Sequence, residues 1–195
     1  MATKQQQREQ TTAALHTTAR RLFAEHGYPN VGLETIAQAA GVTKGALYHH
    51  FSSKAALFRH VLARIQDEVG ERVHQAADAH PDPWTQLVEG CRAFLDAGTD
   101  PEVQQIMLID GPAVLGWNEW RTLDDQSSAR HLADALHTLV DTGTIPRQPV
   151  EPLARLLSGA MNEAALWLAQ SDDTEADRDA TMAALTRMLT ALRAP

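Results

Sequence analysis

Residues 35–51 decide the fold of this 195-residue chain; they read TIAQAAGVTKGALYHHF. Apolar residues at helical spacing flank Gly41, which stands where a helix ends and where a positive φ favours glycine. Thr43 follows as the expected N-cap of a helix over residues 44–50, because its hydroxyl can accept a backbone N–H of the first turn. Two helices joined by such a turn form a helix-turn-helix, whose second helix can enter the major groove of DNA.

Charge is divided unevenly along the chain. The formal net charge is -8, which argues against a nucleic-acid binder if the total alone is considered. Residues 1–60, however, hold seven Lys and Arg against three Glu, a net charge of +4 that leaves -12 for the rest. This asymmetry favours a basic nucleic-acid-binding head on an acidic body.

The longer stretch GLETIAQAAGVTKGALYHHFSSKAALF, residues 32–58, resembles the DNA-binding signature of the TetR family of transcriptional repressors, and the resemblance extends from Thr12 to about Val61. It implies an all-α fold of about nine helices. We expect a helix-turn-helix DNA-binding domain over residues 1–54, preceded by a polar arm, and a C-terminal helical domain over residues 55–195 for ligand binding and dimerisation.

The recognition helix and the start of the following helix supply the expected DNA contacts. Lys44 is long enough to reach guanine or phosphate, and small residues after it permit close approach to the groove. The resemblance places Tyr48 and His50 on phosphates and His49 near base edges. The expected contacts are Thr43, Lys44, Gly45, Ala46, Tyr48, His49, His50 and Lys54. Adjacent histidines on a helix point about 100° apart, so we expect no metal there.

Two positions depart from the family pattern. Gly32 stands where relatives carry Ser or Thr, so the second helix lacks a hydroxyl for a phosphate. Glu34 carries a charge that phosphate repels, and it is either turned aside, which we favour, or accepts from a cytosine amino group.

Helical periodicity continues through the remaining chain. Ser53 is the expected N-cap of a helix of about 27 residues that ends before Pro81 and links head to body. The residues before Thr11 read as a polar arm, and Gly111, Pro112 and Gly116 read as helix breakers. The other expected helices cover residues 10–27, 83–97, 101–110, 119–141, 150–170 and 174–193.

Aromatic and apolar residues of the C-terminal region suggest two further sites. The expected ligand-cavity lining is Phe94, Met107, Trp117 and Trp120, with an ordinary core as the equal alternative. The last two helices carry more apolar surface than one hairpin buries, which is typical of a partner interface. The expected dimerisation residues are Leu157, Met161, Ala164, Leu168, Leu185 and Leu189. Cys91, the single cysteine, is expected to be a buried structural thiol.

The function predicted is a ligand-released repressor that binds a palindromic operator as a homodimer in the cytoplasm, with a small hydrophobic ligand and no cofactor or metal. A dimeric regulator without a ligand response, as scaffold or activator, is the alternative. An enzyme with a DNA-binding head is less favoured, because the chain has no GxSxG, HExxH, P-loop or dinucleotide motif. No apolar run reaches the ~20 residues of a membrane span.

Overall fold

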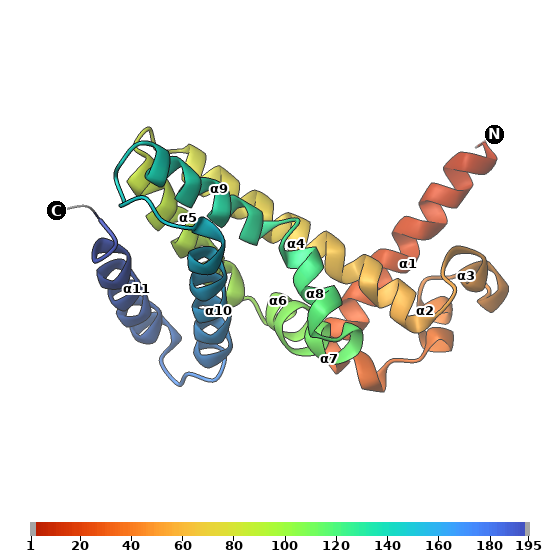
Figure 1. Cartoon of the computed structure of the whole chain (residues 1–195). Coiled ribbons are helices and arrows are strands. Elements are labelled where there is room, and N and C mark those ends of the chain that lie inside the picture. Colours follow the sequence, from red (N-terminus) through yellow and green to blue (C-terminus); the bar gives the residue numbers. More distant parts are fainter. Residues whose placement is uncertain (1–2, 194–195) are drawn as a thin grey trace.

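A computed structural model describes residues 3–193, and every regular element within that range is helical. Figure 1 shows an elongated molecule with a small N-terminal head at one end and a larger body at the other. The head consists of α1 (Lys4–His26), η1 (Tyr28–Asn30), α2 (Leu33–Ala39) and α3 (Lys44–His50). The long helix α4 (Lys54–Asp78) begins against the head and runs into the body.

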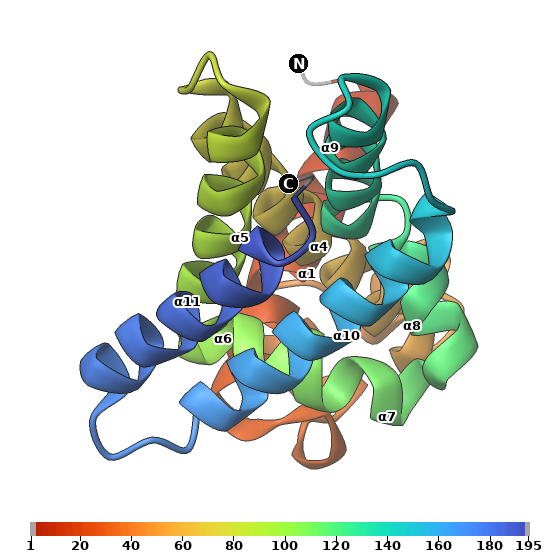
Figure 2. The same ribbon diagram turned by 60° about the vertical axis from the view of Figure 1, so that its left-hand side comes forward.

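The body packs helices around the far half of α4. It contains α5 (Pro83–Gly98), α6 (Pro101–Val103), η2 (Gln104–Asp110), α7 (Gly111–Leu115), α8 (Trp117–Asp124), α9 (Ser128–Asp141), α10 (Val150–Leu168) and α11 (Thr174–Thr190). Figure 2 shows α10 and α11 side by side on the outside of the body, away from the head. One continuous core joins the two parts along α4.

Local sequence explains the head. Phe23, Tyr28 and Phe58 pack together with ring centroids 5.1–5.6 Å apart, and Phe58 meets each of the other two rings edge to face. The expected turn at Gly41 is confirmed by its φ of 69°, and the linking helix is capped as expected, with Ser53 Oγ accepting from the backbone N–H of Ala56 at 3.0 Å.

The N-terminal arm is the first expectation that the structure corrects. Helix α1 begins at Lys4, because Thr3 forms a capping box with Gln6. Its Oγ1 accepts from the Gln6 backbone N–H at 3.2 Å, and the Gln6 side chain accepts from the Thr3 N–H at 2.8 Å. The first two turns are polar but helical, so they project from the head as a rigid rod (Figure 1).

The region from 104 to 128 also differs from expectation. Residues 104–110 form π-helical turns, and Gly111 with Pro112 opens α7 instead of breaking the chain, because proline lacks an N–H that the first turn does not need. Of the three expected breakers, only Gly116, at φ 79°, interrupts the helical path. The single helix expected over 119–141 is two helices, broken between Asp124 and Ser128.

A buried ion pair accounts for that second break. Asp124 and Arg121 are buried, and their side chains meet at 2.9 Å. Asp124 also accepts from Ser128 at 3.2 Å, and Arg121 donates to Ser158 on α10 at 2.8 Å. The pair and its serine partners lie at the turn between α8 and α9 and join it to α10. Among the helices of residues 3–193, none is long and apolar enough to cross a membrane.

The packing of α5 predicts opposite effects for two of its glycines, Gly98 against α10 and Gly90 against α4. A Cβ at Gly98 would lie 2.7 Å from the Ala165 Cβ, whereas a Cβ at Gly90 would meet its neighbours at 3.5 Å or more. We expect Gly98→Ala to lower the free energy of unfolding by about 1–3 kcal/mol through overpacking. Gly90→Ala, the matched control, should raise it by about 0.5–1 kcal/mol, because alanine favours helix. Urea unfolding measures both.

Adding Ala165→Gly to Gly98→Ala removes the clashing methyl group. The double variant should recover part of the lost stability beyond the sum of the single changes. Strict additivity would show that the two helices do not meet at this point.

Candidate nucleic-acid interface and ligand cavity

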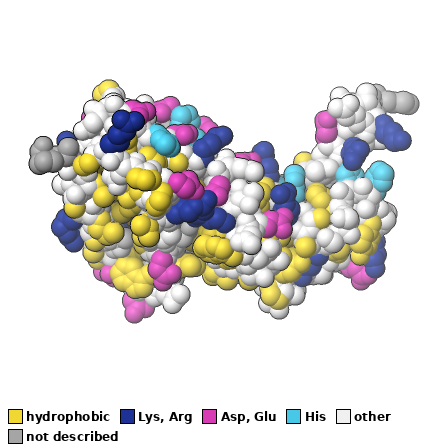
Figure 3. Space-filling model, viewed as in Figure 1, with side chains coloured by type: hydrophobic (Ala, Val, Ile, Leu, Met, Phe, Trp, Pro, Cys, Tyr) yellow, Lys and Arg dark blue, Asp and Glu magenta, His cyan; other side chains and the backbone are white. Residues whose placement is uncertain are grey.

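Helix α3 presents one polar face and one buried face. Thr43 Oγ1 accepts from the Ala46 N–H at 3.1 Å, which confirms the expected N-cap. Leu47 is fully buried, while Tyr48 and His49 on the other side are exposed. Figure 3 shows basic and histidine side chains gathered at this end of the molecule, over α1 and α3. The geometry is that of a recognition helix with its polar side free to enter a groove.

Lys44 and Glu34 form an ion pair between α3 and α2. The hydrogen bond from the Lys44 ammonium, aided by its charge, lowers the pKa of the Glu34 carboxyl. The two alternatives considered from the sequence, a Glu34 turned aside from phosphate or one accepting from a cytosine, did not include this pair within the chain. Glu34 holds the lysine that was expected to reach guanine or phosphate, so DNA must compete with this carboxylate for Lys44.

The last residues of the expected interface also have partners within the chain. His50 Nδ1 lies 3.0 Å from Thr12 Oγ1 on α1, and burial, followed by His49 and Arg8, lowers the pKa of His50. Lys54 Nζ lies 4.0 Å from the centre of the Tyr28 ring. Both side chains thus make contacts inside the head, His50 with α1 and Lys54 with Tyr28.

Head and body are joined by a cluster of polar contacts that the sequence did not indicate. Arg20 of α1 bonds Glu68 of α4 at 2.8 Å and Glu102 of α6 at 2.7 Å. The hydrogen bond to Glu102 is the main cause that raises the pKa of Arg20. Asp110, buried at the end of η2, accepts from the Tyr28 backbone N–H at 2.7 Å. These contacts fix the DNA-binding elements to the body.

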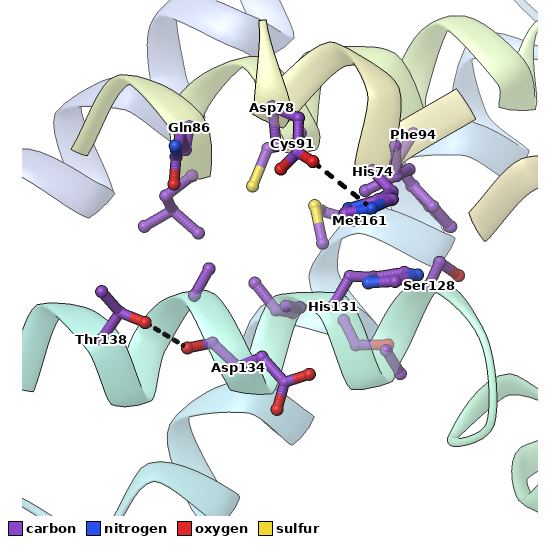
Figure 4. A pocket seen from close by; sticks show the side chains of 18 residues that line it. His74, Asp78, Gln86, Cys91, Phe94, Ser128, His131, Asp134, Thr138 and Met161 are labelled. Atoms are coloured by element: carbon purple, nitrogen blue, oxygen red, sulfur yellow. Dashed lines mark hydrogen bonds and ion pairs between the residues drawn. The ribbon is translucent and has the colours of Figure 1, made fainter. Parts of the chain in front are cut away.

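The body contains a cavity of about 250 Å³ between α4, α5, α9 and α10. Figure 4 shows its walls, with Asp78 and His74 from α4 above and His131 from α9 below. The sulfur atoms of Cys91 and Met161 face the cavity between these walls. A largely apolar cavity with a few polar groups at its edge is the usual form of a small-molecule site.

Of the four residues expected to line a ligand cavity, Phe94 lines this one. Trp117 lies on the surface with 61% of its area exposed. Trp120 and Met107 are core residues, joined by a 2.7 Å hydrogen bond from the Trp120 indole N–H to the Met107 carbonyl. Trp120 and Met107 therefore fit the alternative of an ordinary core, and Trp117 is a surface residue. The spacing of aromatic residues was a poor predictor of cavity-lining residues, because it is the same for side chains packed in a core and for side chains that face a cavity.

Cys91 is buried and lines the cavity. Burial raises the pKa of its thiol to about 12, so the group is a neutral thiol at physiological pH. The expectation of a buried structural thiol is confirmed.

Helices α10 and α11 carry an outward apolar face, but not the one expected. Leu157, Met161, Leu168, Leu185 and Leu189 are buried within the chain, and Ala164 is half-buried. Helical phase explains the error: a small-residue stripe faces the chain's own core as readily as a partner. The exposed large apolar side chains of the two helices are Leu156, Trp167 and Met188. Figure 3 shows hydrophobic side chains over this end of the molecule.

The helix-turn-helix head with an outward recognition helix, joined through one long helix to a helical body with a cavity, defines a DNA-binding transcriptional regulator of the one-component type. Residues 15–61 match the family described as bacterial regulatory proteins, tetR family, and residues 84–192 match the tetracyclin repressor-like C-terminal domain. The chain belongs to the TetR family of transcriptional regulators.

Similar proteins agree with this assignment. A TetR-family transcriptional regulator from Pectobacterium atrosepticum has a crystal structure that superposes with a TM-score of 0.79 at 33% identity, covering 100% of this chain and 99% of that one. The transcriptional repressor AcnR of Corynebacterium diphtheriae is 31% identical over 64% of this chain and 72% of its own length. The transcriptional activator FasR of Mycolicibacterium smegmatis is 37% identical over 46% of this chain, and the matched segment covers 41% of the length of FasR.

The Lys44–Glu34 pair predicts a gain in DNA affinity when the carboxylate is removed. Glu34→Gln should free Lys44 and abolish repulsion of phosphate, so binding to duplex DNA tightens and depends more steeply on salt, by about one phosphate contact. Fluorescence anisotropy over a salt series measures both. The control is Glu25→Gln, which breaks the exposed Arg21–Glu25 pair on α1. Weaker binding by Glu34→Gln would mean that the pair positions α3 rather than competing with DNA.

Proposed function

We propose that this regulator binds a palindromic operator as a homodimer, acts as a repressor in the cytoplasm, and is released from DNA by a small molecule in the body cavity. The single observation that carries the proposal is the placement of α4. Val73 and His74 line the cavity from this helix, and its first turn, at Lys54, directly follows the recognition helix.

A ligand acts through α4 only if it binds the two head positions with different affinities. A coupling of about 1–3 kcal/mol is typical of such regulators in general and requires only small displacements at the cavity. The Arg20 and Asp110 contacts support this route, because they make the head follow movements of α4, α6 and η2 rather than swing independently.

Dimerisation is supported by the outward face of α10 and α11. Leu156, Trp167 and Met188 expose 73%, 50% and 56% of their areas. Leu156 and Trp167 lie eleven residues apart, three helical turns, and so share one face of α10. Two copies packed through this face form a four-helix contact with two-fold symmetry, and the heads stay at the outer ends, free to meet successive major grooves.

A charge on that face should separate the two copies. We expect Trp167→Glu combined with Leu156→Glu to halve the mass seen by sedimentation while leaving the helical circular dichroism unchanged, because both side chains are exposed within the chain. Affinity for an operator selected from random duplexes should fall by about 10²-fold or more, since the second head no longer binds intramolecularly.

Gln170→Glu is the control, because it adds a negative charge of the same kind, one instead of two, at an exposed position just beyond α10. It should leave both mass and affinity unchanged. A double variant that remains dimeric, or a monomer that binds the operator as tightly as before, would contradict the proposal.

A further inference from the structure

The cavity lining has an unusual charge pattern. No lysine or arginine lines it in the described part of the chain, and the Cys91 thiol is neutral. Two aspartates belong to the lining, but in Figure 4 the Asp134 carboxylate turns away from the space, whereas Asp78 points toward it from α4. An anionic ligand would therefore meet a carboxylate and no fixed cation, which disfavours its binding.

The polar groups at the edge are mostly satisfied by the chain itself. Gln86 donates to the His80 carbonyl at 2.7 Å, and Thr138 donates to the Asp134 carbonyl at 3.0 Å. At the inner end, Ser128 and Ser158 bond the buried Asp124–Arg121 pair. The Asp78 carboxylate has one partner among the described side chains, His74, whose Nε2 lies 3.4 Å from Oδ2. Asp78 is therefore the charged group of the lining best able to accept a contact from a ligand.

The remaining walls are flat or polarisable. The His74 and His131 rings stack in parallel across the gap between α4 and α9, with centroids 5.1 Å apart and planes 7° apart. Burial lowers the pKa of His131, and the neighbouring His74 lowers it further. Phe94 and the sulfur atoms of Cys91 and Met161 complete a surface suited to an aromatic ring.

Size limits the ligand further. A volume of about 250 Å³ corresponds to on the order of eight waters at about 30 Å³ each, and hence to a ligand of on the order of ten non-hydrogen atoms.

We propose that the cavity binds a small planar aromatic cation, with its ring between the His74–His131 stack and the Cys91–Met161 sulfurs and its positive charge toward Asp78. This rests on the proposed ligand-responsive function and names the ligand class for that site. The charge contacts Asp78 at the mouth, and the ring gains sulfur–aromatic and cation–π contacts inside.

Three probes with one ring system test the proposal by isothermal titration calorimetry: N-methylquinolinium, uncharged quinoline and the anion quinoline-2-carboxylate. We expect the cation to bind about tenfold tighter than quinoline and the carboxylate to show no binding at millimolar concentration. Equal affinity of cation and carboxylate, or no binding of the cation, would overturn the proposed ligand class.

Asp78→Asn should abolish the preference for the cation and leave the quinoline affinity unchanged. Asp67→Asn is the control, because it removes an exposed charge from the same helix outside the cavity. Both replace exposed side chains, and thermal unfolding checks that each variant folds. A cation preference that survives Asp78→Asn would show that the charge is recognised elsewhere and would overturn the assignment of Asp78.

Release of DNA is measured separately, by anisotropy of a labelled operator during titration with N-methylquinolinium. Binding without release would leave the ligand class in place and contradict ligand-released repression. Release by quinoline-2-carboxylate with no response to the cation would contradict the ligand class and support the function.

Discussion

Arg20 is the residue on which the arrangement of the two parts depends. Arg20 belongs to α1 in the head. Its guanidinium donates to both carboxylate oxygens of Glu68 on α4 and to those of Glu102 on α6. Such charge-assisted, forked contacts are short and directional, so they fix orientation as well as distance. Together with the hydrogen bond from the Tyr28 N–H to Asp110, they join α1 and the turn after it, against which the recognition unit packs, to the body.

This constraint gives the cavity a mechanical role. Its two long walls are the cavity-facing turns of α4 and the helix α5, and α5 leads directly into α6 and η2, which carry Glu102 and Asp110. In the proposed ligand-released repressor, a ligand that displaces α4 and α5 moves the helices that carry both partners of Arg20, Glu68 on α4 and Glu102 on α6. Under the proposed function, displacements at the ligand reach the head through packed helices and ion pairs, which have few intermediate arrangements, rather than through a flexible hinge.

The sequence predicted the elements that depend on local signals. Gly41, Thr43 and Ser53 mark helix ends through backbone conformation and capping, and the structure confirms those ends. Side-chain partners were not predictable: Glu34 was assigned without its pair Lys44, and the contact between Asp110 and Tyr28, 82 residues apart, gave no signal in the sequence. The break before α9 was also missed, because it follows from a buried Arg121–Asp124 pair that periodicity does not show.

Hydrogen–deuterium exchange with and without operator DNA tests the coupling of head and body most directly, since it needs no ligand. The account predicts slowed exchange in α3 on DNA binding and also altered exchange in residues 73–78 of α4 and 101–110, which join the cavity to Arg20. In Glu102→Gln the distant changes should shrink while those of α3 persist. Changes confined to residues 3–53 in the native chain would contradict the account.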